Sequence, residues 1–255
     1  MREFSYQLYS SRNFPPLEDT LRMVANAGYC QVEGYGALFT DLGAANALRA
    51  AMDDTGLTMP TAHFGLDLVT ERASDAVALA RTLGLKAVFV PFVQPQQRPS
   101  DSAGWAAFGS TLAEASKPFL DAGLKFGWRN HEFECAALPS GEMPMDLIMQ
   151  GSDDLMVELD IAWVQVGGQI PFRWIEKYKD RILSAHIKDI APSGECQDED
   201  GWADVGYGVM DWPGLFRALD QTTVEYFVME HDNPSDDTRF AKRSIDTCKG
   251  LEVPA

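Results

Sequence analysis

The chain is poor in cysteine and in basic residues. Its four cysteines, Cys30, Cys135, Cys196 and Cys248, are far apart and form no CxxC pair, which argues against a disulfide framework and against a zinc–thiolate site. Lysine and arginine number 21 against 38 aspartates and glutamates, for a formal net charge of −17. Because nucleic-acid binders concentrate positive charge on one face, this balance disfavours DNA or RNA as a partner.

The chain also lacks long apolar runs and glycine-rich phosphate motifs. No stretch approaches the roughly 20 apolar residues of a membrane helix, and residues 1–4 (MREF) do not begin the apolar segment of a signal peptide. These absences predict a cytoplasmic protein with no membrane partner. No GxGxxG or GxxxxGK pattern follows an apolar run, which counts against a nucleotide-binding open sheet.

What the chain has is a recurring junction between a helical pattern and a short apolar run. Gly28, Gly56 and Gly84 lie 28 residues apart, and Gly123 marks a further junction. Glycine suits the left-handed turn that ends a helix, and the period matches one strand plus one helix with short loops. With 255 residues and 45% hydrophobic content, the chain is long enough for a (β/α)₈ barrel, which needs about 250 residues.

The apolar runs are short and rich in β-forming residues, as in strands buried on both faces of a parallel sheet. We predict strands at 4–9, 30–34, 59–64, 86–92, 124–131, 155–161, 182–188 and 225–230, and helices at 17–27, 43–55, 72–83, 103–122, 143–150, 171–180, 212–220 and 236–249. Eight alternating units favour the α/β class and a single TIM barrel domain over residues 1–255, with a doubly wound open sheet as the alternative. The longest irregular stretch, 191–208, is acidic and is interpreted as a solvated loop or, alternatively, a lid.

All four histidines fall at the C-terminal ends of predicted strands. His63, His131, His186 and His231 end or follow the third, fifth, seventh and eighth strands, and these ends form the rim on which barrel enzymes build their active sites. One histidine there would more often be structural. Four of four favour a functional pocket.

Carboxylates accompany the histidines. They lie on or after the second, sixth, seventh and eighth strands: Glu33, Glu158, Asp160, Asp189 and Glu230. Interior charge is costly unless it is paired, and a divalent metal can pair several carboxylates at once. Asp160, His186 and Glu230 form a set that suits Mn²⁺, Mg²⁺, Co²⁺ or Zn²⁺. The alternative is a metal-free ion network in which Asp160 pairs with Lys188 or Arg129.

Five segments, taken in order, are more specific than any residue alone. They are Asn130-His131-Glu132-Phe133-Glu134, Glu158-Leu159-Asp160-Ile161-Ala162-Trp163, Arg181-Ile182 with His186-Ile187-Lys188-Asp189, the stretch 205–212 (VGYGVMDW), and Glu230-His231-Asp232-Asn233-Pro234. In these segments the chain resembles the xylose-isomerase-like superfamily of sugar phosphate isomerases and epimerases, which also includes inosose dehydratases and hydroxypyruvate isomerases. The resemblance spans nearly the whole chain.

The resemblance implies a divalent metal held by a glutamate, an aspartate, a histidine and a glutamate on the fifth to eighth strands. The last three carry over onto Asp160, His186 and Glu230. The first does not, because Arg129 places a permanent cation where that ligand is expected. Relatives also tend to have glutamate where Tyr207 stands. With one ligand carboxylate missing, a one-base isomerisation or a β-elimination fits better than two-base epimerisation.

Our first hypothesis is therefore a metal-dependent isomerase or epimerase-type enzyme that removes a proton next to the carbonyl of a sugar, keto-sugar or cyclitol, with Mn²⁺ as the first choice of ion. The expected site residues are, for catalysis, Glu230, Lys188 and His131; for substrate binding, His63, Glu33, Arg129, Trp163 and Asp189; and for the metal, Asp160, His186 and Glu230. The alternatives are a dehydratase, a metal-free and catalytically degenerate sugar-binding protein or partner subunit, and a phosphodiesterase of the endonuclease IV kind. Relatives of this kind suggest a homo-oligomer.

Overall fold

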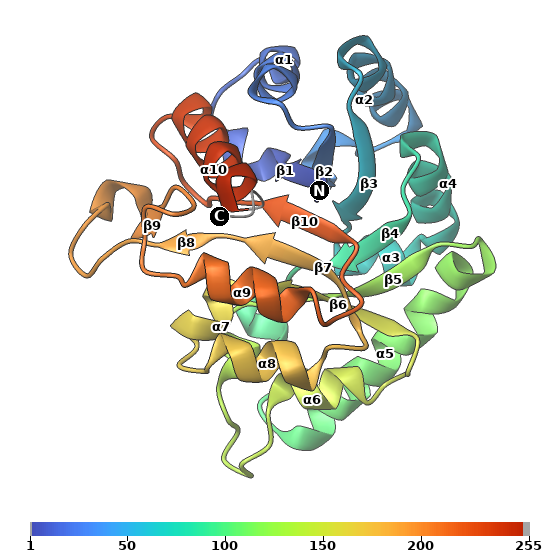
Figure 1. Ribbon diagram of the computed structural model, residues 1–255. Helices are drawn as coiled ribbons and strands as arrows, with labels where there is room; N and C mark the ends of the chain where they lie inside the picture. The colour runs from blue at the N-terminus through green and yellow to red at the C-terminus, as the bar shows by residue number, and fades with distance from the viewer. Residues whose placement is uncertain (1, 252–255) are drawn as a thin grey trace.

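Eight short apolar segments pair side by side in parallel and close into a barrel (Figure 1). The structure is a computed structural model, and it describes residues 2–251. Around the barrel the strands follow the order β1-β10-β7-β6-β5-β4-β3-β2. Their bounds are β1 Phe4–Gln7, β2 Gln31–Tyr35, β3 Thr58–His63, β4 Ala87–Val90, β5 Lys125–Arg129, β6 Leu155–Asp160, β7 Ile182–Ile187 and β10 Tyr226–Met229. The predicted single (β/α)₈ barrel is confirmed.

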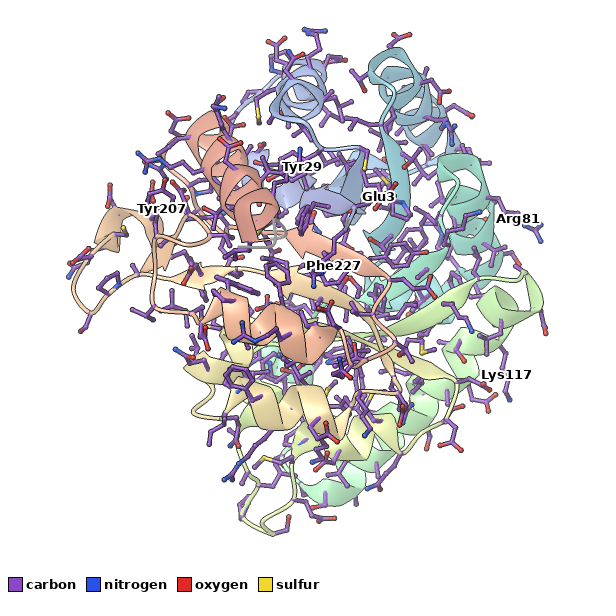
Figure 2. All side chains as sticks on the ribbon, viewed as in Figure 1. Glu3, Tyr29, Arg81, Lys117, Tyr207 and Phe227 are labelled. Atoms are coloured by element: carbon purple, nitrogen blue, oxygen red, sulfur yellow. The ribbon has the colours of Figure 1, made fainter. Side chains whose placement is uncertain are left out.

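Helices surround the barrel, and charged side chains such as Arg81 and Lys117 project from their outer faces (Figure 2). The helices are α1 Leu17–Ala27, α2 Leu42–Thr55, α3 Leu66–Glu71, α4 Ala73–Leu83, α5 Ser102–Asp121, α6 Pro144–Met149, α7 Ile161–Val166, α8 Pro171–Lys177, α9 Trp212–Leu219 and α10 Asp237–Leu251. The short helices α3 and α7 were not predicted. Across residues 2–251, none of the helices combines the length and the apolar character that crossing a bilayer requires.

The junction glycines end helices as their spacing predicts. Gly28, Gly56 and Gly84 have φ values of 96°, 72° and 82° and cap α1, α2 and α4. This left-handed conformation costs glycine least, because glycine has no Cβ. Each cap turns the chain from the outer helical layer back toward the next barrel strand.

The strands divide their side chains between two environments. Val88 and Val90 on β4 belong to the main core between the barrel and the helices, whereas Ala87 and Phe89, which alternate with them, form a small separate apolar cluster with Leu183. Because neighbouring residues of a strand face opposite ways, this second cluster lies inside the barrel. Toward the C-terminal ends of the strands, the interior becomes polar.

The acidic stretch 191–208 is solvated only in part, since Glu195, Asp198 and Asp200 are exposed and the remaining two acidic residues are not. Around it, β8 (Asp189–Ile190) and β9 (Trp202–Ala203) pair as an antiparallel hairpin. Glu199 and Asp204 are buried, and both accept hydrogen bonds from Arg239 of α10. For these two carboxylates the solvated interpretation is wrong, because Arg239 compensates their charge away from water.

Candidate active site

A cavity of about 510 Å³ opens at the C-terminal ends of the strands. This volume is in the range of small-molecule sites. Its lining includes Tyr9, Arg12, Tyr35, His63, Phe92, Arg129, His131, Glu230 and Asp232. The cavity therefore lies on the rim that the histidine positions predict, and it combines aromatic faces with charged groups.

Arg129 ends β5 beside two carboxylates from other strands. Its Nη2 donates to Asp160 Oδ2 at 2.6 Å and also to Glu230 Oε2. All three side chains are buried, so water screens their charges little. The cation thus bridges the two carboxylates that the sequence assigns to a metal.

Asp160 is held in place from several directions. Its Oδ1 accepts a hydrogen bond from the backbone N–H of Trp163 at 3.1 Å and caps α7. Its backbone N–H donates to Asn130 Oδ1, and its carbonyl accepts from Asn130 Nδ2. These bonds explain why β6 ends at Asp160 and why its second carboxylate oxygen points toward Arg129.

Glu230 follows β10 and meets three cationic or protonatable groups. Besides Arg129, His186 Nδ1 lies 3.0 Å and Lys188 Nζ 3.3 Å from its Oε2. Burial disfavours its charged form, but Arg129, Lys188 and His186 outweigh burial and hold the pKa of Glu230 well below its ordinary value. Glu230 is therefore an ionised carboxylate at neutral pH, and it faces the cavity.

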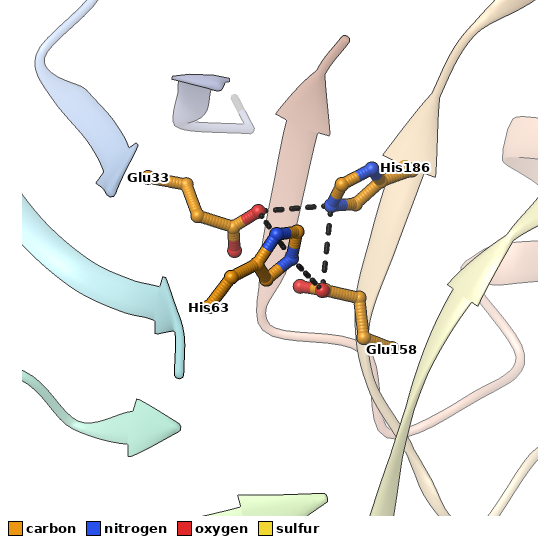
Figure 3. Close-up of side chains that lie close together, drawn as sticks. All are labelled: Glu33, His63, Glu158 and His186. Atoms are coloured by element: carbon orange, nitrogen blue, oxygen red, sulfur yellow. Dashed lines mark hydrogen bonds and ion pairs between the residues drawn. The ribbon is translucent and has the colours of Figure 1, made fainter. Parts of the chain in front are cut away.

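A second group lies on the inner side of His186, and we call it the inner set: Glu33, His63, Glu158 and His186 (Figure 3). His63 Nε2 is 2.6 Å from Glu158 Oε2 and 3.2 Å from Glu33 Oε1. His186 Nε2 is 2.9 Å from Glu33 Oε1 and 3.4 Å from Glu158 Oε2. Burial lowers the pKa of His63, but Glu33 and Glu158 outweigh it and raise that pKa to about 9.

The two groups share one imidazole. Asp160, His186 and Glu230, which we call the outer set, also offer ligand atoms within 4.8 Å of one another. Nδ1 of His186 faces the outer set, and Nε2 faces the inner set. The buried glutamate, aspartate and histidine side chains therefore have the composition of a metal site, with two candidate positions for an ion.

The outer set does not fit a metal while Arg129 keeps its position. A divalent ion bound by carboxylates lies about 2.0–2.2 Å from their oxygens, yet Arg129 Nη2 already contacts one oxygen of Asp160 and one of Glu230. A permanent cation at this place repels a second cation. Asp160, His186 and Glu230, which were expected to bind a metal, thus form a cluster of ion pairs with Arg129.

Lys188 and His131 occupy different surroundings. Lys188 is fully buried behind Glu230, where its Nζ contacts Asp232 Oδ2 at 2.5 Å and lies over the Trp202 ring at 4.1 Å. His131 lines the cavity, and its Nε2 is 3.0 Å from Arg129 Nη1. Burial and the nearby Arg129 hold the pKa of His131 well below its ordinary value, so this imidazole is neutral.

Two predicted substrate-binding residues lie away from the cavity wall. Trp163 packs at 5.5 Å from the His131 ring and lines a neighbouring hollow with Trp202. The Asp189 carboxylate accepts hydrogen bonds from the backbone N–H groups of Ile190, Gly206 and Met210 and from Trp212 Nε1. Asp189 therefore organises the loop after β7, and the structure does not bring it together with the other site residues.

Sequence reasoning missed several residues at the rim. Tyr9, Arg12 and Tyr35 line the cavity from the ends of β1 and β2, and Gln7 donates to Glu33 Oε1 at 2.7 Å. Active sites of barrels form at the C-terminal ends of the strands. Considering every residue after the first two strands, and not only the histidines, would have identified them. Trp202 had no such signal, because it belongs to the β8–β9 hairpin and comes to lie against Lys188 only in the folded chain.

Comparisons with known proteins agree with the barrel fold. The family model described as xylose isomerase-like TIM barrel matches residues 21–250. A sugar phosphate isomerase/epimerase from Parabacteroides distasonis is similar in structure, with a TM-score of 0.83 at 19% identity over 98% of this chain and 94% of that one. The probable 3-DHS dehydratase AsbF from Bacillus anthracis has a TM-score of 0.77 at 14% identity over 97% and 98%. An AP endonuclease, family 2, from Brucella melitensis has a TM-score of 0.71 at 15% identity, over 94% of this chain and 96% of that one. Among curated proteins nothing matches.

Proposed function

Because the chain belongs to the xylose isomerase-like TIM barrel family, we propose that it is an enzyme that removes a proton beside the carbonyl of a small sugar, keto-sugar or cyclitol. The observation that carries the proposal is the contact between Arg129 and Glu230 at the cavity wall. It places an ionised base next to a fixed cation. Proton abstraction next to a carbonyl needs both, since negative charge develops on the carbonyl oxygen as the proton leaves.

Arg129 supplies the positive charge for the developing oxyanion. When the substrate carbonyl oxygen accepts a hydrogen bond from the guanidinium, Glu230 gives up part of its own contact with Arg129. The basicity of Glu230 then rises, because Arg129 is the largest of the groups that lower its pKa. Substrate binding thus activates the carboxylate that removes the proton. Lys188 and Asp232 lie behind Glu230 and restrict its position.

A single carboxylate can complete either of two reactions. In isomerisation, Glu230 takes the proton from the carbon next to the carbonyl, and the electron pair forms an enediolate. The hydroxyl proton on that carbon then passes to the former carbonyl oxygen, and Glu230 returns its proton to the former carbonyl carbon, which leaves the carbonyl at the neighbouring position. In β-elimination, Glu230 takes the same proton and delivers it to the departing hydroxyl, which leaves as water. Neutral His131 lines the cavity, where its ring lies beside a bound substrate.

No step is assigned to a metal at the outer set, because Arg129 stands between the carboxylates that would hold it. The metal that the family implies, with Mn²⁺ expected first and Mg²⁺, Co²⁺ or Zn²⁺ as alternatives, would act as a Lewis acid on the carbonyl. In this chain the guanidinium of Arg129 supplies the positive charge that the metal would otherwise place beside the carbonyl oxygen. A catalytically degenerate sugar-binding protein is the competing proposal, since the same ion pair also neutralises Glu230.

The test is exchange of substrate hydrogen with solvent. A panel of aldoses, ketoses, their phosphates and keto-cyclitols is incubated with the protein in D₂O, and deuterium at the carbon next to the carbonyl is followed by NMR. We expect exchange with at least one member and a loss of about 100-fold or more in Glu230→Gln, the scale of general-base catalysis. Glu176→Gln, at an exposed carboxylate on α8, is the matched control.

The outcomes separate the candidates. Exchange with a rearranged product supports isomerisation, and exchange with loss of water supports elimination. Exchange that survives in Glu230→Gln removes Glu230 as the base. Binding of panel members without any exchange favours the degenerate sugar-binding protein.

A further inference from the structure

We propose that the inner set, Glu33, His63, Glu158 and His186, binds one divalent cation, with Zn²⁺ as the ion whose tetrahedral geometry it suits. The four side chains come from β2, β3, β6 and β7, and they converge inside the barrel just below the cavity (Figure 3). Two imidazole nitrogens and two carboxylate oxygens form a donor set that zinc commonly takes. This position is distinct from the outer set, although the two share His186.

The spacing of the donor atoms supports this assignment. Nitrogen and oxygen atoms alternate around a ring, and the four neighbouring N–O distances run from 2.6 to 3.4 Å. Zinc bonds of about 2.0–2.2 Å place tetrahedral ligands roughly 3.3–3.6 Å apart. The ligand shell therefore needs only small outward movements of His63 and His186 to enclose an ion. The two imidazole rings are nearly parallel, with 5.5 Å between centroids.

An unsatisfied oxygen provides an independent indication. Glu158 is fully buried, and its Oε1 has no hydrogen-bond partner among the described residues. A buried carboxylate oxygen without a partner is costly. No contact between the inner carboxylates and an arginine or lysine appears among the salt bridges of residues 2–251. The positive charge there belongs to imidazoles, which release their protons when a metal binds, whereas the guanidinium of Arg129 in the outer set cannot.

The surroundings of the inner set also resemble the second shell of a metal site. Thr61 Oγ1 donates to Glu33 Oε2 at 2.5 Å. Glu33 Oε1, which accepts from Gln7 Nε2, faces the two histidines. Nδ1 of His186 lies 3.0 Å from Glu230 Oε2, the partner that directs the opposite nitrogen, Nε2, toward an ion. If the proposed function holds, the ion also orients Glu230 through His186, which makes His186 a positioning residue.

Zinc binding tests the inner set without reference to any substrate. The protein is stripped with EDTA, dialysed, and titrated with ZnCl₂ by calorimetry, and bound zinc is counted by mass spectrometry. We expect one equivalent in wild type and at least about 100-fold weaker binding in Glu33→Gln and Glu158→Gln, beyond what losing an outer hydrogen bond costs. Asp160→Asn, a matched change in the outer set, should bind as wild type. Cobalt in the same site should show the visible absorption of a tetrahedral complex.

Three results would overturn the proposal. One is the absence of stoichiometric zinc in wild type. Another is binding that is lost in Asp160→Asn and kept in Glu33→Gln, which places the ion in the outer set. The third is an unchanged melting temperature on adding zinc to the stripped wild-type protein, since a ligand of the folded state raises it. The melting curve of each stripped variant reports whether that variant folds. Because none of these measurements involves turnover, they stay separate from deuterium exchange.

Discussion

Arg129 Nη2 lies 2.6 Å from Oδ2 of Asp160, so a side chain that cannot lose its charge holds one of the carboxylates expected to bind a metal. Arg129 thereby decides how the outer set behaves. It pairs Asp160 and Glu230 with each other through one guanidinium, and it leaves the inner set as the place for a divalent ion.

Replacing Arg129 with glutamate should create a metal site in the outer set. The Arg129→Glu variant removes the cation and adds a third carboxylate beside Asp160 and Glu230, where the resemblance places a ligand. We expect one more equivalent of Mn²⁺ or Zn²⁺ than wild type binds, measured by calorimetry. The double variant Arg129→Glu, Asp160→Asn is the control, and it should lose the added equivalent. An unchanged stoichiometry would contradict the role given to Arg129.

Replacing Arg129 with glutamine should change how activity depends on pH. Arg129 lowers the pKa of Glu230, so its removal raises that pKa, and the carboxylate becomes protonated at higher pH. Because the base acts only when ionised, the acidic limb of the exchange rate should shift to higher pH, with a fall of about 100-fold at neutral pH from the lost oxyanion contact. A pH profile of deuterium exchange measures both effects. A lower rate with an unshifted limb would show that Arg129 does not set the basicity of Glu230.

Glu134 should make the folded protein less stable as pH rises. This buried carboxyl group accepts hydrogen bonds from Trp128 Nε1 and the backbone N–H of His131, and burial raises its pKa to about 8. Its unfolded pKa lies near 4.3. The folded state therefore holds the proton more tightly, so the stability it contributes is complete below about pH 4.3 and is lost as pH rises to about 8.

Urea unfolding at several pH values measures this dependence. Glu134→Gln, which cannot ionise, should show a flatter fall in the free energy of unfolding between pH 5 and 8 than wild type does. Glu142→Gln, at an exposed position, should leave the slope as it is. Parallel slopes for Glu134→Gln and wild type would mean that Glu134 ionises in the folded state as it does in the unfolded chain.

Arg239 should stabilise the segment around the β8–β9 hairpin. It contacts Glu199 at 2.9 Å and Asp204 at 3.0 Å, and both carboxylates are buried. Arg239→Met should lower the free energy of unfolding by about 1–3 kcal/mol, because it leaves two buried acceptors with less compensation. Lys242→Met, which removes an exposed i,i+4 pair with Asp246, should cost less than about 0.5 kcal/mol. Equal losses of unfolding free energy in the two variants would contradict a stabilising role of Arg239 beyond that of an exposed ion pair.

Local patterns predicted most of the architecture. The helix at 17–27 has the predicted bounds, and β7 and β10 begin and end within one or two residues of the predicted strands. These features depend on residues near one another in sequence, such as the glycine that stops a helix. The hairpin of β8 and β9 escaped prediction because its pairing depends on Asp189, which collects the N–H groups of a distant loop.

The amino-acid sequence by itself determined the order of strands and helices, the rim on which the histidines gather, and the presence of Arg129 where the resemblance places a ligand. Only the tertiary structure decided which partner each charged group has. Closure of the barrel brings Glu33 and Glu158 to one nitrogen of His186 and Glu230 to the other. The reason is physical: periodicity and helix caps act over a few residues, whereas a buried charge is stabilised by whichever opposite charge the folded chain places within a few ångströms.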